Sequence, residues 1–412
     1  MKKFELIFFS VILGTLVIVV GAYIHSQRPK FKKVKTFTNE IQYVKASGKC
    51  IECHRRETGS IVHQFEMSKH ASANLNCLDC HQALDGQQMI SHKGFSITKD
   101  VTAKNCASCH KTEYDQFSRS RHAAPAWAAV RGDQDFTAEQ IRYSEQYHPG
   151  TVIRPSNALS LVENKGTVEK GCMGCHSIGQ PNLDGSIGSC TECHSKHNPS
   201  IEMARKPTTC AQCHMGPDHS QFEIYSESKH GAMLSAYNDK INYGASSKKL
   251  TTKDFFVPTC ATCHMSGLEG MKVTHDTTER LSLFLYAPVS EKRPHFQQGR
   301  DQMKEVCLKC HTQNNVDKFY QQGDLVVLET NKTVKEANTI IAELKNDGVI
   351  DKKPFNEEIE FLAFDLWHYY GRTAKHGAFM GGADFVQWHG NYELLHKMVK
   401  LKKQAHELRV KH

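Results

Sequence analysis

The chain has 412 residues, of which 39% are hydrophobic and 9% aromatic, and it carries a formal net charge of +8 at pH 7. A chain of this length ordinarily folds into two or three domains, each with its own apolar core. The hydrophobic content is modest for that arrangement and argues against it, so the 16 cysteines become the feature that needs an explanation.

Residues 1–35 are predicted to form a separate N-terminal segment. A run of 19 positions, from Leu6 to Ile24, contains no charged residue and is long enough to span a bilayer as a helix. Small residues at positions 20–22 would also suit the end of a cleaved signal peptide, but the length of the run favours an uncleaved anchor. Basic residues between 28 and 35 outnumber those before the run, which alone would place the body in the cytoplasm.

Eight C-x-x-C-H motifs follow between residues 50 and 311, and together they use all 16 cysteines. In a c-type haem site the two thiols bind the porphyrin covalently, and the adjacent histidine becomes an axial ligand of the iron. Structural zinc sites would require the motifs to pair and would not need a histidine after every second cysteine. The sequence therefore predicts eight covalently bound haems c. The motifs are Cys50/Cys53/His54, Cys77/Cys80/His81, Cys106/Cys109/His110, Cys172/Cys175/His176, Cys190/Cys193/His194, Cys210/Cys213/His214, Cys260/Cys263/His264 and Cys307/Cys310/His311.

Eight haems change the expectations for fold, charge and location. Because burying a porphyrin replaces the burial of Leu and Phe side chains, residues 36–315 are predicted to form a mainly α haem domain of short helices and long loops. The haems would contribute a charge of about −8 when oxidised, which offsets the +8 of the chain and removes the argument for nucleic-acid binding. Covalent haem attachment in bacteria occurs outside the cytoplasmic membrane, so we expect a periplasmic body tethered to that membrane.

Seventeen histidines remain beside the eight motif histidines, and they can supply second axial ligands. Four of them share one local context, Ser-Lys/Arg-His, and a recurring tripeptide indicates a recurring role. These four predicted distal ligands are His70, His122, His197 and His230, and the further candidates are His92, His275 and His389. Seven such ligands would leave one iron with an open face, where a small molecule can bind and react.

The segment MGPDHSQ, residues 215–221, offers a place to look for the chemistry at that face. Its Gly-Pro dipeptide predicts a turn, which puts Asp218 and His219 on a loop. A carboxylate beside an imidazole can orient the ring and deliver protons near neutral pH. From spacing alone, the alternative is equally good: His219 is another iron ligand, and Asp218 is its hydrogen-bond partner.

Two cysteine-free stretches carry the remaining helical signals. The gap between the third and fourth motifs predicts a helix around Tyr114–Val130 and a loop near Pro149–Pro155. Apolar residues at helical spacing predict a C-terminal helical segment over residues 316–412, with helices in 317–347 and 356–403. Within it, residues 376–390 are rich in glycine and histidine, which indicates either a helix break at 381–382 or a contribution to a haem pocket.

Several motifs taken together resemble the octahaem cytochromes of the hydroxylamine oxidoreductase family. They are CMGCHSIG, ARKPTTCAQCHMGPDHSQ, ESKHG and GADFxxWHG, and the resemblance extends from the first motif to about His396. It implies that the haem on Cys172 and Cys175, with His176 as proximal ligand, is the open catalytic one. It also implies that Asp218 and His219 are the catalytic pair, and that the protein is a homotrimer held partly by C-terminal helices.

One departure from that family bears on the direction of the reaction. The oxidising members have a late tyrosine that cross-links to the catalytic haem of the neighbouring subunit, whereas residues 376–390 contain Phe379 and Phe385 and no tyrosine. The branch without it is reductive. The resemblance thus implies a nitrite and hydroxylamine reductase, forming hydroxylamine or ammonium with electrons from a quinol-oxidising membrane cytochrome. The alternatives are a hydroxylamine or hydrazine oxidoreductase and a non-catalytic electron-transfer protein.

Overall fold

The computed structural model describes residues 14–16, 18–20, 22–23 and 43–412. The apolar run predicted to span a membrane therefore lies largely outside the described residues. In the described part of the chain, no helix combines the length and the apolar composition that crossing a bilayer requires. Residues 43–412 all belong to one compact unit, so the predicted haem domain and the C-terminal helices are parts of the same body.

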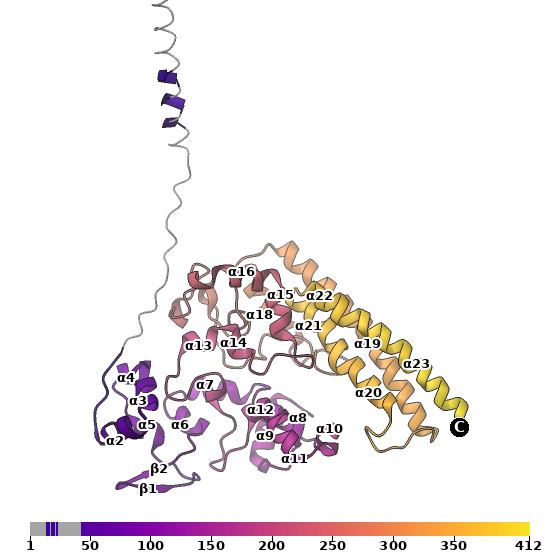
Figure 1. Ribbon diagram of the computed structural model, residues 1–412, viewed down its shortest axis with the longest axis horizontal. Helices are drawn as coiled ribbons and strands as arrows, with labels where there is room; N and C mark the ends of the chain where they lie inside the picture. Colours follow the sequence, from indigo (N-terminus) through magenta and orange to yellow (C-terminus); the bar gives the residue numbers. More distant parts are fainter. Residues whose placement is uncertain (1–13, 17, 21, 24–42) are drawn as a thin grey trace, which may run out of the picture. The chain divides into compact units, whose positions relative to one another are not determined.

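Between residues 49 and 311 the chain forms short helices joined by loops (Figure 1), as predicted. Among the described residues there is one sheet, an antiparallel pair in which Ile90 of β1 (Ile90–His92) lies opposite Ile97 of β2 (Phe95–Ile97). The helices and 3-10 turns are α2 (Lys49–Glu57), α3 (Gly59–Glu66), α4 (Lys69–Ser72), α5 (Cys77–His81), α6 (Ala103–Ala107), α7 (Lys111–Ser118), α8 (Ala124–Arg131), α9 (Ala138–Tyr147), α10 (Ala158–Val162), α11 (Lys165–Lys170), α12 (Cys172–His176), η1 (Ser177–Gly179), η2 (Cys190–Glu192), α13 (Ile201–Arg205), α14 (Pro207–Cys210), α15 (Gln221–Glu227), α16 (Lys229–Tyr237), η3 (Asn238–Lys240), η4 (Ser247–Lys249), α17 (Cys260–His264), η5 (Leu268–Gly270) and α18 (Phe296–Leu308).

Several haem motifs form one-turn helices, and local side-chain chemistry explains where these begin. α5 starts after Asn76 and α17 starts after Thr259, each in a reciprocal capping box with the third helical residue, Asp79 or Thr262. Residues three and four positions apart lie on the same side of a helix. In these two helices the motif therefore presents both thiols and the imidazole to one side.

The predicted helix around Tyr114–Val130 is wrong in extent, because two helices occupy the region. α7 ends at Ser118, and α8 begins at Ala124. Pro125 lies in the first turn of α8, where its missing N–H costs little, and Ser120 accepts a hydrogen bond from the backbone of His122 in the intervening turn. The predicted loop near Pro149–Pro155 is present.

After His311 the chain forms longer helices, and the predicted C-terminal helical segment is confirmed. α19 has 34 residues, and α19, α20 and α23 lie side by side in Figure 1. α21 ends at Gly381, whose φ of 75° is left-handed, so the predicted helix break is also present. The elements are α19 (Gln313–Asn346), α20 (Glu358–Asp365), the π-helical η6 (Leu366–Gly371), α21 (Arg372–Met380), α22 (Ala383–Val386), the π-helical η7 (Gln387–Tyr392) and α23 (Glu393–Lys411).

The two parts are built around different interiors. The C-terminal helices enclose a continuous apolar cluster that includes Leu344, Ile359 and Leu401, all with 0% exposure. Residues 49–311 instead contain separate small clusters, for example around Phe255 and Ala124, beside a connected cavity of about 3500 Å³. Since protein interiors are close-packed, this cavity is the space for large bound groups.

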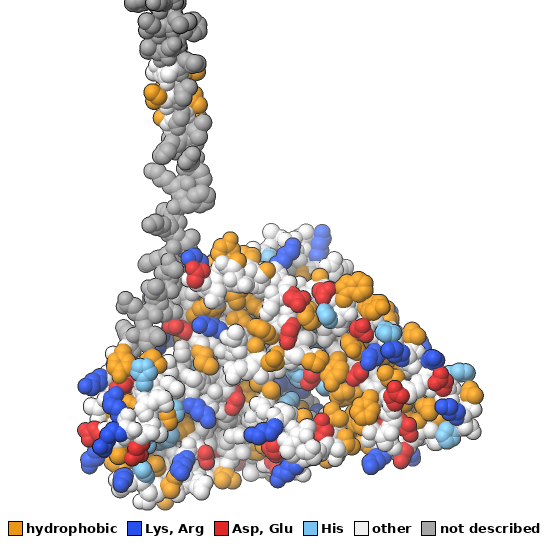
Figure 2. Space-filling view, viewed as in Figure 1, with side chains coloured by type: hydrophobic (Ala, Val, Ile, Leu, Met, Phe, Trp, Pro, Cys, Tyr) orange, Lys and Arg blue, Asp and Glu red, His pale blue; other side chains and the backbone are white. Residues whose placement is uncertain are grey.

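Positively and negatively charged side chains are mixed on the face of the protein shown in Figure 2. On the face shown in Figure 2, basic and acidic side chains of residues 43–412 are interspersed, with apolar side chains between them. This face therefore presents no continuous basic surface.

Candidate haem-binding and active site

The cavity brings together most of the residues that the sequence predicts to bind haem. All 16 cysteines are free of disulfides, and 13 of them line the cavity. So do all eight motif histidines and six of the seven predicted distal ligands. These six are His70, His92, His122, His197, His230 and His275.

Three of the predicted attachment cysteines are not among the residues that line the cavity. They are Cys53, Cys109 and Cys310, each the second cysteine of its motif. Cys109 and Cys310 are exposed, and each lies beyond the end of its helix, α6 at Ala107 and α18 at Leu308.

Cys53 lies inside a helix, α2, three residues after Cys50. The same spacing inside α5 and α17 brings both thiols to the cavity, so the position of Cys53 reflects how α2 packs. Cys50 and His54 line the cavity, whereas Cys53 is partly buried beside it. In these three motifs the geometry supports attachment through the first cysteine and the histidine, and attachment through Cys53, Cys109 and Cys310 stays a prediction.

Hydrogen bonds of the motif histidines suit metal ligation. Nδ1 of His176 donates to the carbonyl of Ala126 at 2.5 Å, and Nδ1 of His81 donates to the carbonyl of Thr98 at 3.0 Å. A metal-bound histidine characteristically gives its second nitrogen to such an acceptor, which fixes the ring and leaves Nε2 for the metal. The donor set thus fits haem iron, and the free thiols beside it fit covalent attachment.

Five predicted distal histidines face motif histidines across the cavity. An imidazole–metal bond is about 2 Å long, so a metal between two imidazoles holds the ring centroids roughly 6 Å apart. The observed centroid distances fall between 5.9 and 6.5 Å. The pairs, motif histidine first, are His54 and His92, His110 and His70, His81 and His197, His214 and His122, and His311 and His230.

The other predicted ligands are placed less uniformly. Burial and then the charge of His275 lower the pKa of His194 to about 4, so these two also lie close together. His389 is a correction: its side chain is 61% exposed and its Nε2 lies 3.1 Å from Asp384, away from the cavity. For His264, no ring pair with a predicted distal ligand occurs among the described residues.

Neighbouring motifs lie close enough for their haems to approach each other. Cys190 hydrogen-bonds to Cys106, which raises the pKa of the Cys106 thiol. Burial and the nearby Cys175 raise the pKa of Cys213 to about 12. The third motif therefore lies against the fifth, and the fourth against the sixth, which places the attached edges of haems from different motifs side by side.

Asp218 and His219 lie on the predicted loop, between α14 and α15. Gly216 has φ 77°, the left-handed conformation that the turn requires, and its backbone N–H donates to Glu223 at 2.8 Å. The His219 ring lies 6.3 Å from that of His176, in an edge-on arrangement at 79°. The turn therefore brings the Asp-His pair to two motif histidines, His176 and, at 6.2 Å between ring centroids, His214.

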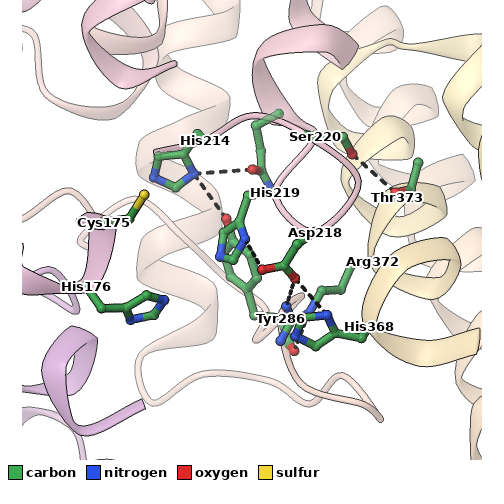
Figure 3. Close-up of polar contacts among 12 residues, drawn as sticks. Cys175, His176, His214, Asp218, His219, Ser220, Tyr286, His368, Arg372 and Thr373 are labelled. Carbon is green, nitrogen blue, oxygen red and sulfur yellow. Dashed lines mark hydrogen bonds and ion pairs between the residues drawn. The ribbon is translucent and has the colours of Figure 1, made fainter. Parts of the chain in front are cut away.

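Three donors converge on the carboxylate of Asp218 (Figure 3). Oδ2 lies 2.5 Å from Nδ1 of His219, whereas Oδ1 lies 2.8 Å from Nδ1 of His368 and 2.7 Å from a guanidinium nitrogen of Arg372. Burial alone would raise the pKa of Asp218, but the hydrogen bonds from His219 and His368 hold it well below its usual range. Asp218 therefore stays a carboxylate and fixes the His219 ring through Nδ1.

His368 and Arg372 are the site residues that sequence reasoning missed. His368 is in the π-helical turn η6 and stacks on Phe364 at 4.2 Å, and Arg372 opens α21. The guanidinium carbon of Arg372 lies 4.8 Å from the Trp367 ring centroid, which holds it beside Asp218. A π-helical turn often marks a functional site, but the sequence carries no signal for it.

A second group of side chains joins this site to the sixth motif. The ring centroid of Tyr286 lies 5.2 Å from that of His219, and its hydroxyl lies 3.1 Å from Nδ1 of His214. His376 lies 4.7 Å from Tyr286, ring to ring, and donates from Nδ1 to the carbonyl of Arg372 at 2.8 Å. Both predictions for the glycine- and histidine-rich segment therefore hold. His376 lines the cavity, and the helix breaks at Gly381.

A mainly α fold around a histidine- and cysteine-lined cavity defines the class as a c-type multihaem cytochrome. The family profile "Seven times multi-haem cytochrome CxxCH" matches residues 73–357, and the chain belongs to this family. Membership indicates covalently bound haem c and a redox role.

Comparison with individual proteins adds relatives of a particular kind. The chain is 26% identical over 349 residues, 74% of its length, to a "Probable nitrite reductase-hydroxylamine oxidoreductase fusion protein" of Kuenenia stuttgartiensis, and it spans 38% of that protein. Among solved structures, a "Hypothetical multiheme protein" is similar with TM-score 0.74 and 22% identity, over 92% of this chain and 97% of that one. A reducing HAO-like protein complex of the same organism has TM-score 0.66 and 20% identity, over 87% and 84%.

Proposed function

We propose that this protein is a membrane-tethered periplasmic reductase of nitrite and hydroxylamine with eight haems c, one of which, on Cys172, Cys175 and His176, has an open iron face. The observation that carries the proposal is the Asp218-bound His219 facing His176. Among the described histidines that face a motif histidine, His219 is the one whose Nδ1 lies on a carboxylate. The carboxylate fixes the ring and its tautomer, as it would for a metal ligand, and it also orients a proton donor.

The positions of the side chains around His176 suggest a role for each of them. When bound, the haem on His176 supplies electrons and an iron face for the nitrogen of the substrate. His219 keeps Nδ1 on Asp218, so Nε2 is the nitrogen left to pass protons to the substrate oxygen as the N–O bond breaks. Arg372 and His368 hold Asp218 from the opposite side and keep the pair in place. Bulk water can recharge His219, because its side chain remains 24% exposed.

The remaining haems would serve as an electron path to this site. The fourth motif lies against the sixth through Cys175 and Cys213, so a haem held by His214 would supply electrons to the one held by His176. A quinol-oxidising membrane cytochrome is the proposed donor, and a homotrimer the proposed assembly. The names of the Kuenenia relatives include nitrite reductase, hydroxylamine oxidoreductase and a reducing HAO-like complex, and the last of these supports the reductive direction.

Spectroscopy and turnover together test the proposal. The purified ferric protein is expected to show one high-spin haem among low-spin ones by paramagnetic resonance, and the ferrous protein to lack a red-shifted band. Reduced viologen dye should then be oxidised when nitrite is added. Oxidation of hydroxylamine with a red-shifted ferrous band would assign the protein to the oxidising branch, and the absence of high-spin haem would leave an electron carrier.

A further inference from the structure

Two partly buried arginines share one phenylalanine ring in the wall of the cavity. The guanidinium carbon of Arg121 lies 5.3 Å from the centroid of Phe284, and that of Arg293 lies 4.8 Å from it. All three residues line the cavity. Two like charges against one ring repel each other, so the arrangement needs an anion to be stable.

No protein group in the described part of the chain supplies that anion. Neither guanidinium forms a hydrogen bond or ion pair there, and Nη1 of Arg121 is buried without a partner. The nearby carboxylate of Asp276 accepts instead from the backbone and hydroxyl of Thr278, at 2.9 and 2.6 Å. His148, also close, donates from Nε2 to the carbonyl of Arg119 at 2.5 Å. Because an unpaired buried charge is costly, the anion must come from a bound group.

The position of the arginines identifies which bound group that is. Arg121 immediately precedes His122, whose ring faces the motif histidine His214 at 5.9 Å. A haem held between these two histidines carries two propionate carboxylates at its edge. Arginine is well suited to bind a carboxylate through two parallel hydrogen bonds.

The Ser-Lys/Arg-His tripeptides repeat the same arrangement. Ser68 and Ser228 cap α4 and α16 by accepting hydrogen bonds from backbone N–H groups at 3.1 and 3.2 Å, so the basic residue and the histidine open each helix together. The basic residue lines the cavity in all four cases. These residues are Lys69, Arg121, Lys196 and Lys229. In the tripeptides of Ser68 and Ser228, the serine therefore fixes a cation and an iron-facing histidine side by side.

We propose that Arg121 and Arg293 bind a propionate carboxylate of the haem between His122 and His214, and thereby set the reduction potential of that haem. The inference rests on the proposed ligation by these two histidines. Reduction adds an electron to the haem, and a nearby positive charge in a dry environment stabilises it. The two guanidiniums therefore raise the midpoint potential of this haem, which is the proposed electron donor to the catalytic one.

Redox titration of the full-length holoprotein tests this role without using turnover. Arg293→Gln should lower the midpoint potential of one low-spin component and leave the other components unchanged, and Arg121→Gln should lower the same component. Arg293→Lys keeps the charge and should restore much of the potential. Arg56→Gln, which removes the same charge at an exposed position on α2, is the matched control and should behave as the wild type.

The outcomes separate this inference from the proposed function. Unchanged titration curves in both glutamine variants, with a full complement of haem by pyridine haemochrome assay, would overturn the inference. A potential that follows the concentration of added chloride at constant ionic strength would also overturn it, because the anion would then be a free ion. Nitrite turnover is measured separately, so a failed nitrite assay leaves the titration result interpretable.

Discussion

The haem region, residues 49–311, and the C-terminal helices, residues 313–411, differ in what occupies their interiors. The helices bury their own apolar side chains, such as Leu366 and Leu401 at 0% exposure, in a continuous cluster. The haem region has a cavity of about 3500 Å³ where a core would be. The difference shows that the cofactor takes the place of apolar side chains in one part of the chain and not in the other, which explains the modest hydrophobic content.

Removing the haems should have the largest effect on the difference between the two regions. Chain produced without haem attachment should lose fixed structure in residues 49–311, because the cavity then has nothing to fill it. The C-terminal helices should retain more of theirs. Limited proteolysis with mapping of the cleavage sites measures both regions at once, with the mature holoprotein as the control. Equal resistance of the two regions in the haem-free chain would contradict the interpretation.

The proposed catalytic pair lies where the two regions meet, because Arg372 and His368 of the C-terminal part hold Asp218 of the haem region. His219→Ala should lower nitrite turnover by roughly 10²- to 10⁴-fold, the range expected for loss of a general acid. Haem content should stay complete. His389→Ala, at an exposed histidine outside the cavity, is the control and should keep both turnover and low-spin haem content. Near-normal turnover of His219→Ala would refute the assignment.

Shortening a side chain within the apolar cluster tests whether that cluster is the core of the C-terminal helices. Leu344→Ala on α19 removes a side chain with 0% exposure and should lower the free energy of unfolding by about 2–5 kcal/mol. Leu328→Ala on the same helix, at 51% exposure, should have little effect. Thermal unfolding followed by circular dichroism at a fixed haem content compares them. Equal losses would mean that the cluster is not the core of this part.

A buried lysine gives a smaller, pH-dependent effect. Lys375 on α21 has 0% exposure and donates to the carbonyl of Ala287 and the hydroxyl of Ser290, at 2.9 and 2.8 Å. Burial and then the charge of Arg372 lower its pKa from 10.5 to about 7. The unfolded chain binds this proton between those two pH values and the folded chain does not, so the free energy of unfolding should rise with pH across that window.

Lys375→Met should flatten that rise, because methionine cannot bind a proton. Lys332→Met, at a position with 62% side-chain exposure, should keep it. Denaturation midpoints at pH 7, 8 and 9 distinguish the two variants. A wild-type stability that stays constant over this range would contradict the placement of Lys375 as a neutral amine.

Sequence reasoning predicted the fold where the signal is local. The eight haem motifs predicted a region of short helices and long loops, and helical periodicity gave α19 to within a few residues. The proposed helix over residues 114–130 failed because Pro125 and the turn at Ser120 favour a new start, and periodicity alone does not show a break.

The candidate site was predicted in part for the same reason. Asp218 and His219 are adjacent in the sequence and follow a Gly-Pro turn, so they could be singled out without a structure. His368 and Arg372 lie about 150 residues later, and only the packing of η6 and α21 against the loop brings them to Asp218. His389 resembled a ligand in composition but lies at the surface.

The cysteines also show what the sequence could not predict, namely which thiols of a motif line the cavity. Cys53 and Cys109 belong to intact C-x-x-C-H motifs, yet neither lines the cavity. Which way a thiol faces depends on how its segment packs, because Cys193 and Cys213 also lie beyond the ends of their helical turns and yet line the cavity. Motif spacing alone carries no information on that packing.

The sequence by itself determined the covalent chemistry, because the two cysteines and the histidine that attach a haem are neighbours in the chain and need no distant partner. Tertiary structure alone decided which second histidine faces which motif, since each pair joins residues far apart, as His122 and His214 do. It also decided that one carboxylate, Asp218, has three donors from two regions. Contacts between distant residues depend on how helices pack, and local sequence does not encode that.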